Sequence, residues 1–495
     1  LHRSRLTRSL FAVWGQTLKA LPTEWKGCRV AILGLARSGL ALARVLTERG
    51  AQVLISDQRL GAELGDAVTQ AQGLGVRFEL GGHSDEVLDS DVLIVSPGVS
   101  LHAPLVRQAL QNGVIVTGEV EIAYRFCPRP LVAVTGTNGK STTCSLLHAI
   151  LGHRSRLAGN IGVPLVAEVT GDLTDVDYVI AEISSFQLET THSFRPYLAV
   201  LTNITPDHLD RHKTMDEYIR AKARLFAHQG ASDIAIFNAD DANASRLAQE
   251  VAAGNFAPWS SFPAPQAGPR TVLHYSAESE VEWGAWFQEG SFWVRLPGSS
   301  AQKILDWDFE NLPGPHNLSN ALAATLAAHC LGATGAKIAQ AFAPYRPMHH
   351  RLETVASLQG VRFVDDSKAT NVSSVESALL TYQEPIVLIA GGRDKGLNLE
   401  QLGESIARHC HALIGIGEAG PRIVELARER GLQKTGLALS MDEAVRLAHS
   451  MAPSPGVVLL SPACTSFDMF RNAEHRGDEF VASVHRWIEN SLEER

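Results

Sequence analysis

The chain has 495 residues, a formal net charge of −9 at pH 7, 45% hydrophobic residues and 20% charged residues. This length predicts about three domains, and the acidic balance argues against a general nucleic-acid-binding protein, which would carry a basic surplus. No apolar run approaches the length of a membrane span. We therefore expect a soluble protein with full hydrophobic cores, no membrane span and no nucleic-acid partner.

Residues 1–25 form a basic stretch whose first acidic residue is Glu24. This composition is compatible with a transit peptide, but we interpret the stretch as an N-terminal extension outside the fold. The six cysteines are scattered, without a C-x-x-C pair or metal-ligand spacing, which is typical of buried thiols in a reducing compartment.

Residues 26–118 have the pattern of a parallel α/β unit, with short apolar strands that alternate with helical segments. The glycine turn at 34–39, GLARSG, is a near miss of the dinucleotide motif G-x-G-x-x-G. Asp57 ends the next strand, where a ribose-binding acid would lie. A ligand site and a structural turn are both compatible with this pattern, and no hydride-transfer site supports a dehydrogenase.

Residues 119–346 contain a second α/β unit, in which the segment 132–143, VAVTGTNGKSTT, indicates a strand, a phosphate loop and a helix. The usual phosphate loop has a glycine at the position of Val134, whereas here the earlier glycine is Gly136. Glu182 ends a second strand, and a third leads to Asn203, Asp207 and His208. A nucleotide with magnesium needs such a loop, a lysine, a hydroxyl and an acid. Residues 256–270 read as a loop, and residues 271–298 as a small added antiparallel sheet.

Residues 347–495 form a third α/β unit, after a predicted linker at 345–353. Three of its strands end in polar clusters, at 363–371, 391–396 and 459–470. Their lysines and hydroxyls suit a small anionic substrate such as an amino acid. Each cluster alone, however, would be interpreted as the polar residues of a turn and solvated charges. Cys464 has no histidine paired with it in the sequence, so we expect a buried structural thiol.

Seven motifs together resemble the Mur ligases of bacterial peptidoglycan synthesis: TGTNGKST, SSFQLE, NITPDHLDRH, GPHNLSNALAA, HRLE, DDSKATN and SPACTSFD. The resemblance covers nearly all of the chain from residue 26 onward, and the shortened phosphate loop is the family's own version. It implies three domains: a UDP-binding Rossmann-like domain at 26–118, a central P-loop NTPase-like domain at 119–346, and an amino-acid-binding Rossmann-like domain at 347–495. It also implies a cytoplasmic bacterial enzyme that acts as a monomer.

The activity implied by the resemblance is ATP-dependent formation of an amide bond. ATP phosphorylates a substrate carboxylate, and an amine then attacks the acyl phosphate. The motifs DDSKATN and SPACTSFD favour the branch that joins D-glutamate to UDP-N-acetylmuramoyl-L-alanine. A sibling Mur ligase, a folylpolyglutamate synthase and a non-catalytic nucleotide sensor are the alternatives.

The resemblance also implies the site residues, four of which are catalytic: Lys140, Glu182, His208 and Lys222. The residues implied for ATP are Gly136, Thr137, Asn138, Gly139, Lys140, Ser141, Thr142, Asn317, Asn320, Arg351 and Asp366. Those implied for the UDP substrate are Ser38, Asp57, Ser96, Pro97, Gly98, Asn160 and Ser184. Those implied for D-glutamate are Lys368, Thr370, Lys395 and Ser466.

Two Mg²⁺ ions are implied, one held by Ser141 and Glu182 and the other by His208 and Lys222. Taken alone, Lys222 is a lysine on the solvated face of an amphipathic helix. The resemblance instead implies that carbon dioxide carbamylates it, which replaces an ammonium with a carboxylate-like group. The sequence departs from the family pattern at Ala36-Arg37 and at Ala473.

Overall fold

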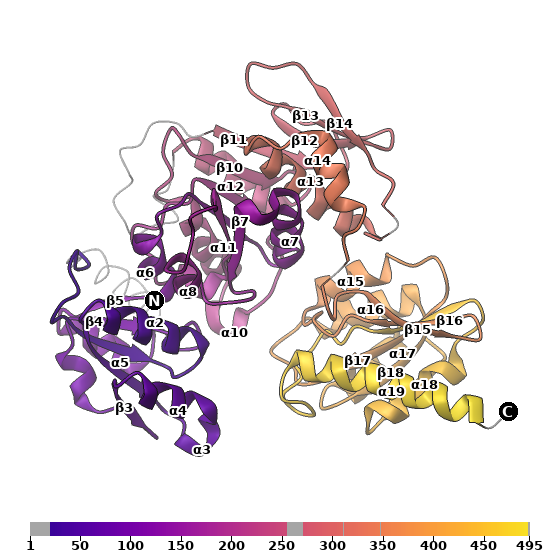
Figure 1. The fold of residues 1–495 in the computed structure, drawn as a ribbon. Helices are drawn as coiled ribbons and strands as arrows, with labels where there is room; N and C mark the ends of the chain where they lie inside the picture. The colour runs from indigo at the N-terminus through magenta and orange to yellow at the C-terminus, as the bar shows by residue number, and fades with distance from the viewer. Residues whose placement is uncertain (1–19, 255–270, 310, 347, 494–495) are drawn as a thin grey trace, which may run out of the picture. The chain divides into compact units, whose positions relative to one another are not determined.

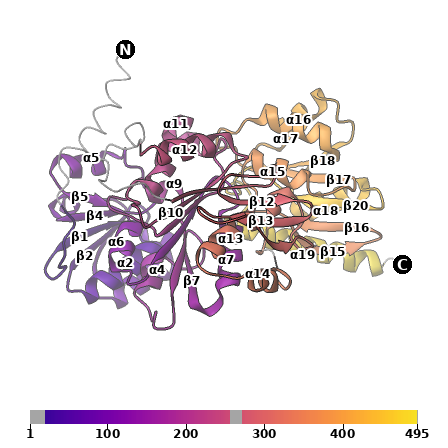
Figure 2. The same ribbon diagram turned by 90° about the horizontal axis from the view of Figure 1, so that it is seen from above.

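The computed structural model describes residues 20–254, 271–309, 311–346 and 348–493, which form three sheets flanked by helices (Figures 1 and 2). The chain divides into two compact units. The first unit comprises residues up to 204 together with 214–306 and 322–340, and the second comprises 205–213, 307–321 and 341–495. None of the described helices combines the length and the apolar character needed to cross a membrane. The stretch 1–19 and the predicted loop 256–270 lie outside the described residues.

The N-terminal sheet has five parallel strands in the order β3-β2-β1-β4-β5. Its strands are β1 (Arg29–Leu33), β2 (Gln52–Asp57), β3 (Arg77–Leu80), β4 (Val92–Val95) and β5 (Ile115–Thr117). Its helices are α2 (Arg37–Glu48), α3 (Gly61–Leu64), α4 (Asp66–Gly73) and α5 (Pro104–Gln111). This is the order of a doubly wound sheet whose switch point lies between β1 and β4, as the Rossmann-like prediction requires.

The hydrophobic core of this region begins before residue 26. Leu21 and Trp25 are buried in the same core cluster as Val30 and Ile32 of β1. Apolar residues this close to a strand gain free energy by leaving water. Leu21 and Trp25 therefore pack with the fold, although both lie in the stretch that we interpreted as an extension.

The central sheet has nine strands, in the order β14-β13-β12-β11-β10-β9-β6-β8-β7. Its parallel strands are β6 (Leu131–Thr135), β7 (Ser155–Gly159), β8 (Tyr178–Glu182), β9 (Leu198–Leu201), β10 (Ile234–Asn238), β11 (Thr271–Ser276) and β12 (Gly284–Gln288). Strands β13 (Ser291–Arg295) and β14 (Gln302–Asp306) add an antiparallel edge. β6, β8 and β9 are apolar and almost wholly buried, as expected for parallel strands covered on both faces.

Residues 271–298 form strands as predicted, but these strands continue the central sheet and do not make a separate one. β11 is parallel to β10 because helix α12 (Ala242–Ala252) returns the chain to the end of the sheet where β10 began. The helices of this region are α6 (Glu119–Phe126), α7 (Lys140–Leu151), α8 (Leu165–Val169), α9 (Ser185–Leu188), α10 (Leu209–His212), α11 (Met215–Ala223), α12 (Ala242–Ala252), α13 (Pro315–Cys330) and α14 (Gly335–Phe342).

The C-terminal sheet has six strands in the order β15-β16-β20-β17-β18-β19, with β15 antiparallel to β16. Its strands are β15 (Glu353–Leu358), β16 (Val361–Asp365), β17 (Ile386–Gly391), β18 (Cys410–Ile416), β19 (Thr435–Ala438) and β20 (Gly456–Leu460). Its helices are α15 (Val372–Leu379), α16 (Leu399–His409), α17 (Gly420–Glu429), α18 (Met441–Met451) and α19 (Ala473–Glu493).

Candidate active site

The predicted phosphate loop connects β6 to α7, and its two glycines have distinct roles. Gly139 has φ +81° and precedes the first residue of α7. Gly136 lies against the end of β9, where a Cβ would be 1.8 Å from Oγ1 of Thr202. Only glycine permits this approach. The loop thus leads into the N-terminus of a 12-residue helix, where backbone N–H groups favour an anion.

Residues at the end of β9 hold this loop in place. The backbone N–H of Asn138 donates to Oδ1 of Asn203 at 2.9 Å, and the Asn203 amide donates back to the Asn138 carbonyl at 3.2 Å. Thr202 Oγ1 donates to the same carbonyl at 2.6 Å. Sequence reasoning placed Asn203 at this strand end but missed Thr202, because a threonine at a strand end is too common to be a signal.

Lys140 lies folded against its own loop. Its Nζ donates to the carbonyl oxygens of Gly136 at 3.0 Å and Thr137 at 2.7 Å. The ammonium therefore lies over the loop that would hold phosphates, where it can neutralise phosphate charge. Thr142 lies in the first turn of α7, two residues after Lys140.

Glu182, at the end of β8, accepts hydrogen bonds from two of the predicted site residues. Ser141 Oγ donates to its Oε2 at 2.6 Å, and Asn160 Nδ2 donates to its Oε1 at 2.7 Å. A hydroxyl and a carboxylate are the oxygen donors that Mg²⁺ prefers, so these residues fit the predicted ion. Ser184 lies just beyond, where it caps α9 by accepting from the N–H of Gln187.

Lys222 is only 1% exposed, so the solvated-helix interpretation is wrong. Its Nζ donates to the carbonyl of Gly136 at 2.7 Å and lies 4.4 Å from the ring centre of Tyr218. The Tyr218 hydroxyl is in turn 3.2 Å from Oγ1 of Thr137. Helix α11 therefore brings a second lysine to the carbonyl that Lys140 also contacts.

In the second unit, Asp207 joins His208 to a predicted substrate-binding residue. Lys395 Nζ is 2.6 Å from Oδ1 of Asp207, and Asn371 Nδ2 donates to Oδ2 at 3.1 Å. The backbone N–H of His208 donates to Oδ1 at 2.9 Å. Burial alone would raise the pKa of Asp207, but the charge of Lys395 holds it below its ordinary value. Asn371 and the anchoring role of Asp207 were not foreseen, because their partners are distant in sequence.

The three polar clusters of the C-terminal sheet follow β16, β17 and β20, which are neighbouring parallel strands. Their carboxyl ends therefore share one edge, where α/β proteins bind ligands. Lys368 Nζ lies 3.6 Å from Glu474, while Ser466 is buried and Thr370 half-buried. Cys464 is fully buried, as expected, and burial raises the pKa of its thiol to about 12.

The residues predicted to contact the nucleotide from this unit are mostly buried. Asn317 and Asn320 lie on one face of α13, and Asn317 Nδ2 donates to the Pro313 carbonyl at 2.7 Å. Asp366 accepts from Ser461 Oγ at 2.9 Å, and burial raises its pKa to about 7, although the charge of Arg351 opposes the rise. The Arg351 guanidinium donates to the Lys368 carbonyl at 3.3 Å.

At the N-terminal switch point, Ser38 lies in the first turn of α2 and Ser96-Pro97-Gly98 follows β4. Asp57 accepts the Leu35 N–H at 2.7 Å and an Arg59 guanidinium N–H at 2.7 Å. Burial alone would raise the pKa of Asp57, but the Arg59 and Leu35 hydrogen bonds lower it to about 2. Asp57 thus fixes the glycine turn.

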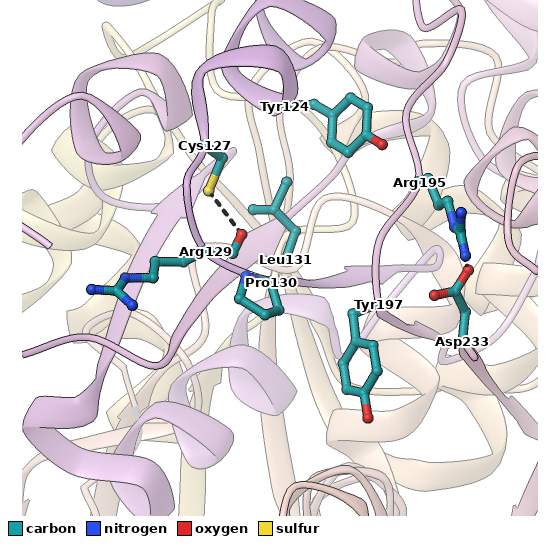
Figure 3. A pocket seen from close by; sticks show the side chains of 8 residues that line it. All are labelled: Tyr124, Cys127, Arg129, Pro130, Leu131, Arg195, Tyr197 and Asp233. Atoms are coloured by element: carbon teal, nitrogen blue, oxygen red, sulfur yellow. Dashed lines mark hydrogen bonds and ion pairs between the residues drawn. The ribbon is translucent and has the colours of Figure 1, made fainter.

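A cavity of about 240 Å³ lies at the amino ends of β6, β9 and β10, at the opposite end of these strands from the phosphate loop (Figure 3). It is lined by Tyr124, Cys127, Arg129, Pro130, Leu131, Arg195, Tyr197 and Asp233. Arg195 pairs with Asp233 at 2.6 Å, and Arg129 donates to the Leu173 and Thr174 carbonyls. Because both of these arginines are engaged by protein acceptors, the cavity adds nothing to the site.

Comparison with known families gives consistent matches along the chain. Residues 28–118 match the N-terminal domain of MurD-like Mur ligases, residues 134–328 the Mur ligase middle domain, and residues 350–464 the glutamate ligase domain of the Mur ligases.

Curated relatives include the UDP-N-acetylmuramoylalanine–D-glutamate ligase of Pelotomaculum thermopropionicum, which is 41% identical over 92% of this chain and 97% of its own. The enzyme of the same name from Geobacter metallireducens is 41% identical over 93% of this chain and 98% of its own. Among solved structures, UDP-N-acetylmuramate-alanine ligase from Thermotoga maritima shares the fold with a TM-score of 0.54, at 17% identity over 94% of this chain and all of the other. The chain belongs to the Mur ligase family.

Proposed function

We propose that this chain is the ATP-dependent ligase that joins D-glutamate to UDP-N-acetylmuramoyl-L-alanine in peptidoglycan precursor synthesis. The observation that carries the proposal is the shared edge of β9, β6 and β8, where the phosphate loop, Lys140 and the Ser141–Glu182 pair meet. The relatives named for D-glutamate ligation, at 41% identity, support this choice of amino acid.

The reaction needs an activated carboxylate, because an oxide is a very poor leaving group. ATP transfers its terminal phosphoryl group to the substrate carboxylate, which gives an acyl phosphate and ADP. The amine of D-glutamate then attacks the carbonyl carbon, and the tetrahedral intermediate collapses with loss of phosphate. Catalysis therefore depends on neutralising negative charge at the phosphates.

Lys140 and the loop amides hold the phosphates in this proposal. Mg²⁺, when bound, would neutralise charge on the transferring group. Ser141 and Glu182 would hold one ion, which their donor set fits, and His208 with a carbamylated Lys222 would hold the second. Asn317, Asn320, Arg351 and Asp366 complete the nucleotide contacts.

Carbamylation of Lys222 is supported by its burial against the phosphate loop. An unmodified ammonium there would place a second positive charge beside Lys140, where a metal ion is proposed. In the modification, the neutral amine adds to carbon dioxide with loss of a proton and forms an N-carboxylate. The product keeps one N–H, which can still donate to the Gly136 carbonyl, and it gains oxygen ligands for a hard cation.

The substrates are proposed to bind at the sheet edges. Ser38, Asp57 and Ser96-Pro97-Gly98 would hold the uridine diphosphate end, with Asn160 and Ser184 along the muramoyl-peptide path. Lys368, Thr370, Lys395 and Ser466 would hold the carboxylates of D-glutamate. We further propose that the enzyme works as a monomer in the bacterial cytoplasm.

A panel of amine substrates tests the proposal. The protein is incubated with ATP, Mg²⁺, UDP-N-acetylmuramoyl-L-alanine and one amino acid at a time, while phosphate release is measured. We expect release with D-glutamate, and none with L-glutamate, L-lysine or meso-diaminopimelate. Preference for a diamino acid would indicate a sibling ligase. A second incubation, with a folate acceptor and glutamate, would detect a folylpolyglutamate synthase, and no release in either incubation would indicate a nucleotide sensor.

A further inference from the structure

Three side chains of the C-terminal unit lie close together beside the segment that carries Arg351. His349 and His350 precede β15, and Asp478 lies near the start of α19. Oδ1 of Asp478 is 3.6 Å from Nε2 of His350 and 3.8 Å from Nε2 of His349, and the three residues can each offer one ligand atom within 4.8 Å of the other two. Tetrahedral Zn²⁺ with bonds of about 2.0–2.1 Å holds its ligand atoms about 3.3 Å apart. The atoms are farther apart than the ligands of a zinc ion, and rotation of the mostly exposed side chains of His349 and Asp478 would be needed to bring them to that spacing.

Both histidine rings are oriented by a carboxylate on the other nitrogen. Nδ1 of His350 donates to Asp365 at 2.6 Å, and Nδ1 of His349 donates to Glu353 at 2.6 Å. Metal-binding histidines characteristically have such a partner, which fixes the tautomer and leaves the Nε2 lone pair for the ion. The group His350, Glu353 and Asp365 also lies close together, but the 2.6 Å bond leaves no room for an ion between ring and carboxylate. Glu353 and Asp365 therefore orient the histidine rings and do not themselves bind the ion.

The backbone at His350 and at Gly477 of α19 allows the His350 ring to lie against this helix. His350 is buried and has φ +62°, a conformation that turns its ring onto α19. Gly477 accommodates the ring, because a Cβ there would lie 2.1 Å from Nδ1 of His350. The side chains of His349 and Asp478 are 62% and 64% exposed, so an ion reaches them from solvent.

We propose that His349, His350 and Asp478 form a binding site for a divalent transition metal such as Zn²⁺, with a water molecule as fourth ligand. Two imidazoles and one carboxylate suit Zn²⁺ and not Mg²⁺, which prefers oxygen donors. The bound ion would fasten the segment before β15 to α19. Because the Lys368 N–H donates to the His350 carbonyl, this ion would also stiffen the segment that carries Arg351 and Lys368.

Zinc titration of the full-length untagged protein, stripped of metal and kept in excess Mg²⁺, tests the proposal. His349→Ala and Asp478→Ala remove exposed ligands and should leave the fold intact, which melting without metal verifies. His485→Ala is the matched control, because His485 is an exposed histidine on the same helix.

Calorimetry should find that the wild type and the control bind one more equivalent of Zn²⁺ than either ligand variant does. If the number of bound ions is equal, the wild type and the control should bind Zn²⁺ at least tenfold more tightly. Co²⁺ should give the intense visible absorption of a four-coordinate site in the wild type and control only. Equal stoichiometry and affinity in all four proteins would overturn the proposal.

Discussion

The Nζ atom of Lys222 donates a hydrogen bond to the carbonyl oxygen of Gly136 at 2.7 Å, which links helix α11 to the phosphate loop. We predict that Lys222→Ala lowers kcat by at least about 100-fold, because the proposed carbamate and its metal ligands are lost. Acetate or another short carboxylate, in chloride-free buffer, should restore part of the activity. Phosphate release with and without the carboxylate is the measurement.

The control for this variant is Arg220→Ala, which removes an exposed cation from the same helix and should remain active without rescue. Full activity of Lys222→Ala would exclude a catalytic role for this lysine. An inactive Lys222→Ala that no carboxylate rescues, with melting unchanged, would argue against the carbamate.

Lys140→Ala should lose phosphate release by about 100- to 1,000-fold, because one preorganised charge on the transferring group is removed. The fold should be retained, since its Nζ donates to carbonyls of its own loop. Turnover and thermal melting of the variant, measured side by side, check both parts. Wild-type turnover would contradict the assignment of the ATP site.

Lys395→Met should raise the KM for D-glutamate about 10- to 100-fold, the effect of losing a hydrogen bond to a charged group. The KM for ATP should change little. Steady-state kinetics with each substrate varied in turn separates the two constants, and Lys434→Met, which removes an exposed lysine of the same unit, is the control. An unchanged KM for D-glutamate would leave Lys395 with only its ion pair to Asp207.

The buried carboxyl of Asp366 should make stability fall as pH rises. Its folded pKa of about 7 lies above the ordinary value of 3.8, so its stabilising contribution is full below about pH 4 and is lost as pH rises through about 7. Between pH 5 and pH 8 this loss amounts to about 3 kcal/mol, and Asp366→Asn should not show it. Urea unfolding of the nucleotide-free protein at the two pH values measures the difference. Equal pH dependence in the wild type and the variant would contradict the raised pKa.

Sequence patterns were sufficient for the strands whose ends carry the predicted site residues, but they did not predict β7 and β10 of the central sheet. Parallel order brings the carboxyl ends of β9, β6 and β8 to one edge, so Lys140, Glu182 and Asn203 could be grouped before any coordinates. The same argument grouped the clusters after β16, β20 and β17.

Contacts that depend on how separate elements pack could not be predicted. The burial of Lys222 depends on α11 packing beside the phosphate loop, and helical periodicity alone gives it a solvated face. Asp207 meets Lys395 across 188 positions of sequence. Leu21 and Trp25 were set aside with a basic segment, although apolar residues next to a strand can extend its core.

Transfer of labelled oxygen tests the central claim, ligation of D-glutamate through an acyl phosphate, most directly. The protein is incubated with ATP, Mg²⁺, D-glutamate and UDP-N-acetylmuramoyl-L-alanine labelled with ¹⁸O in both carboxylate oxygens, and the products are analysed by mass spectrometry. The account predicts one ¹⁸O in the released phosphate and one in the new amide carbonyl, in equal amounts. Unlabelled phosphate alongside amide product would contradict the acyl phosphate, and the absence of a D-glutamyl product would contradict the function itself.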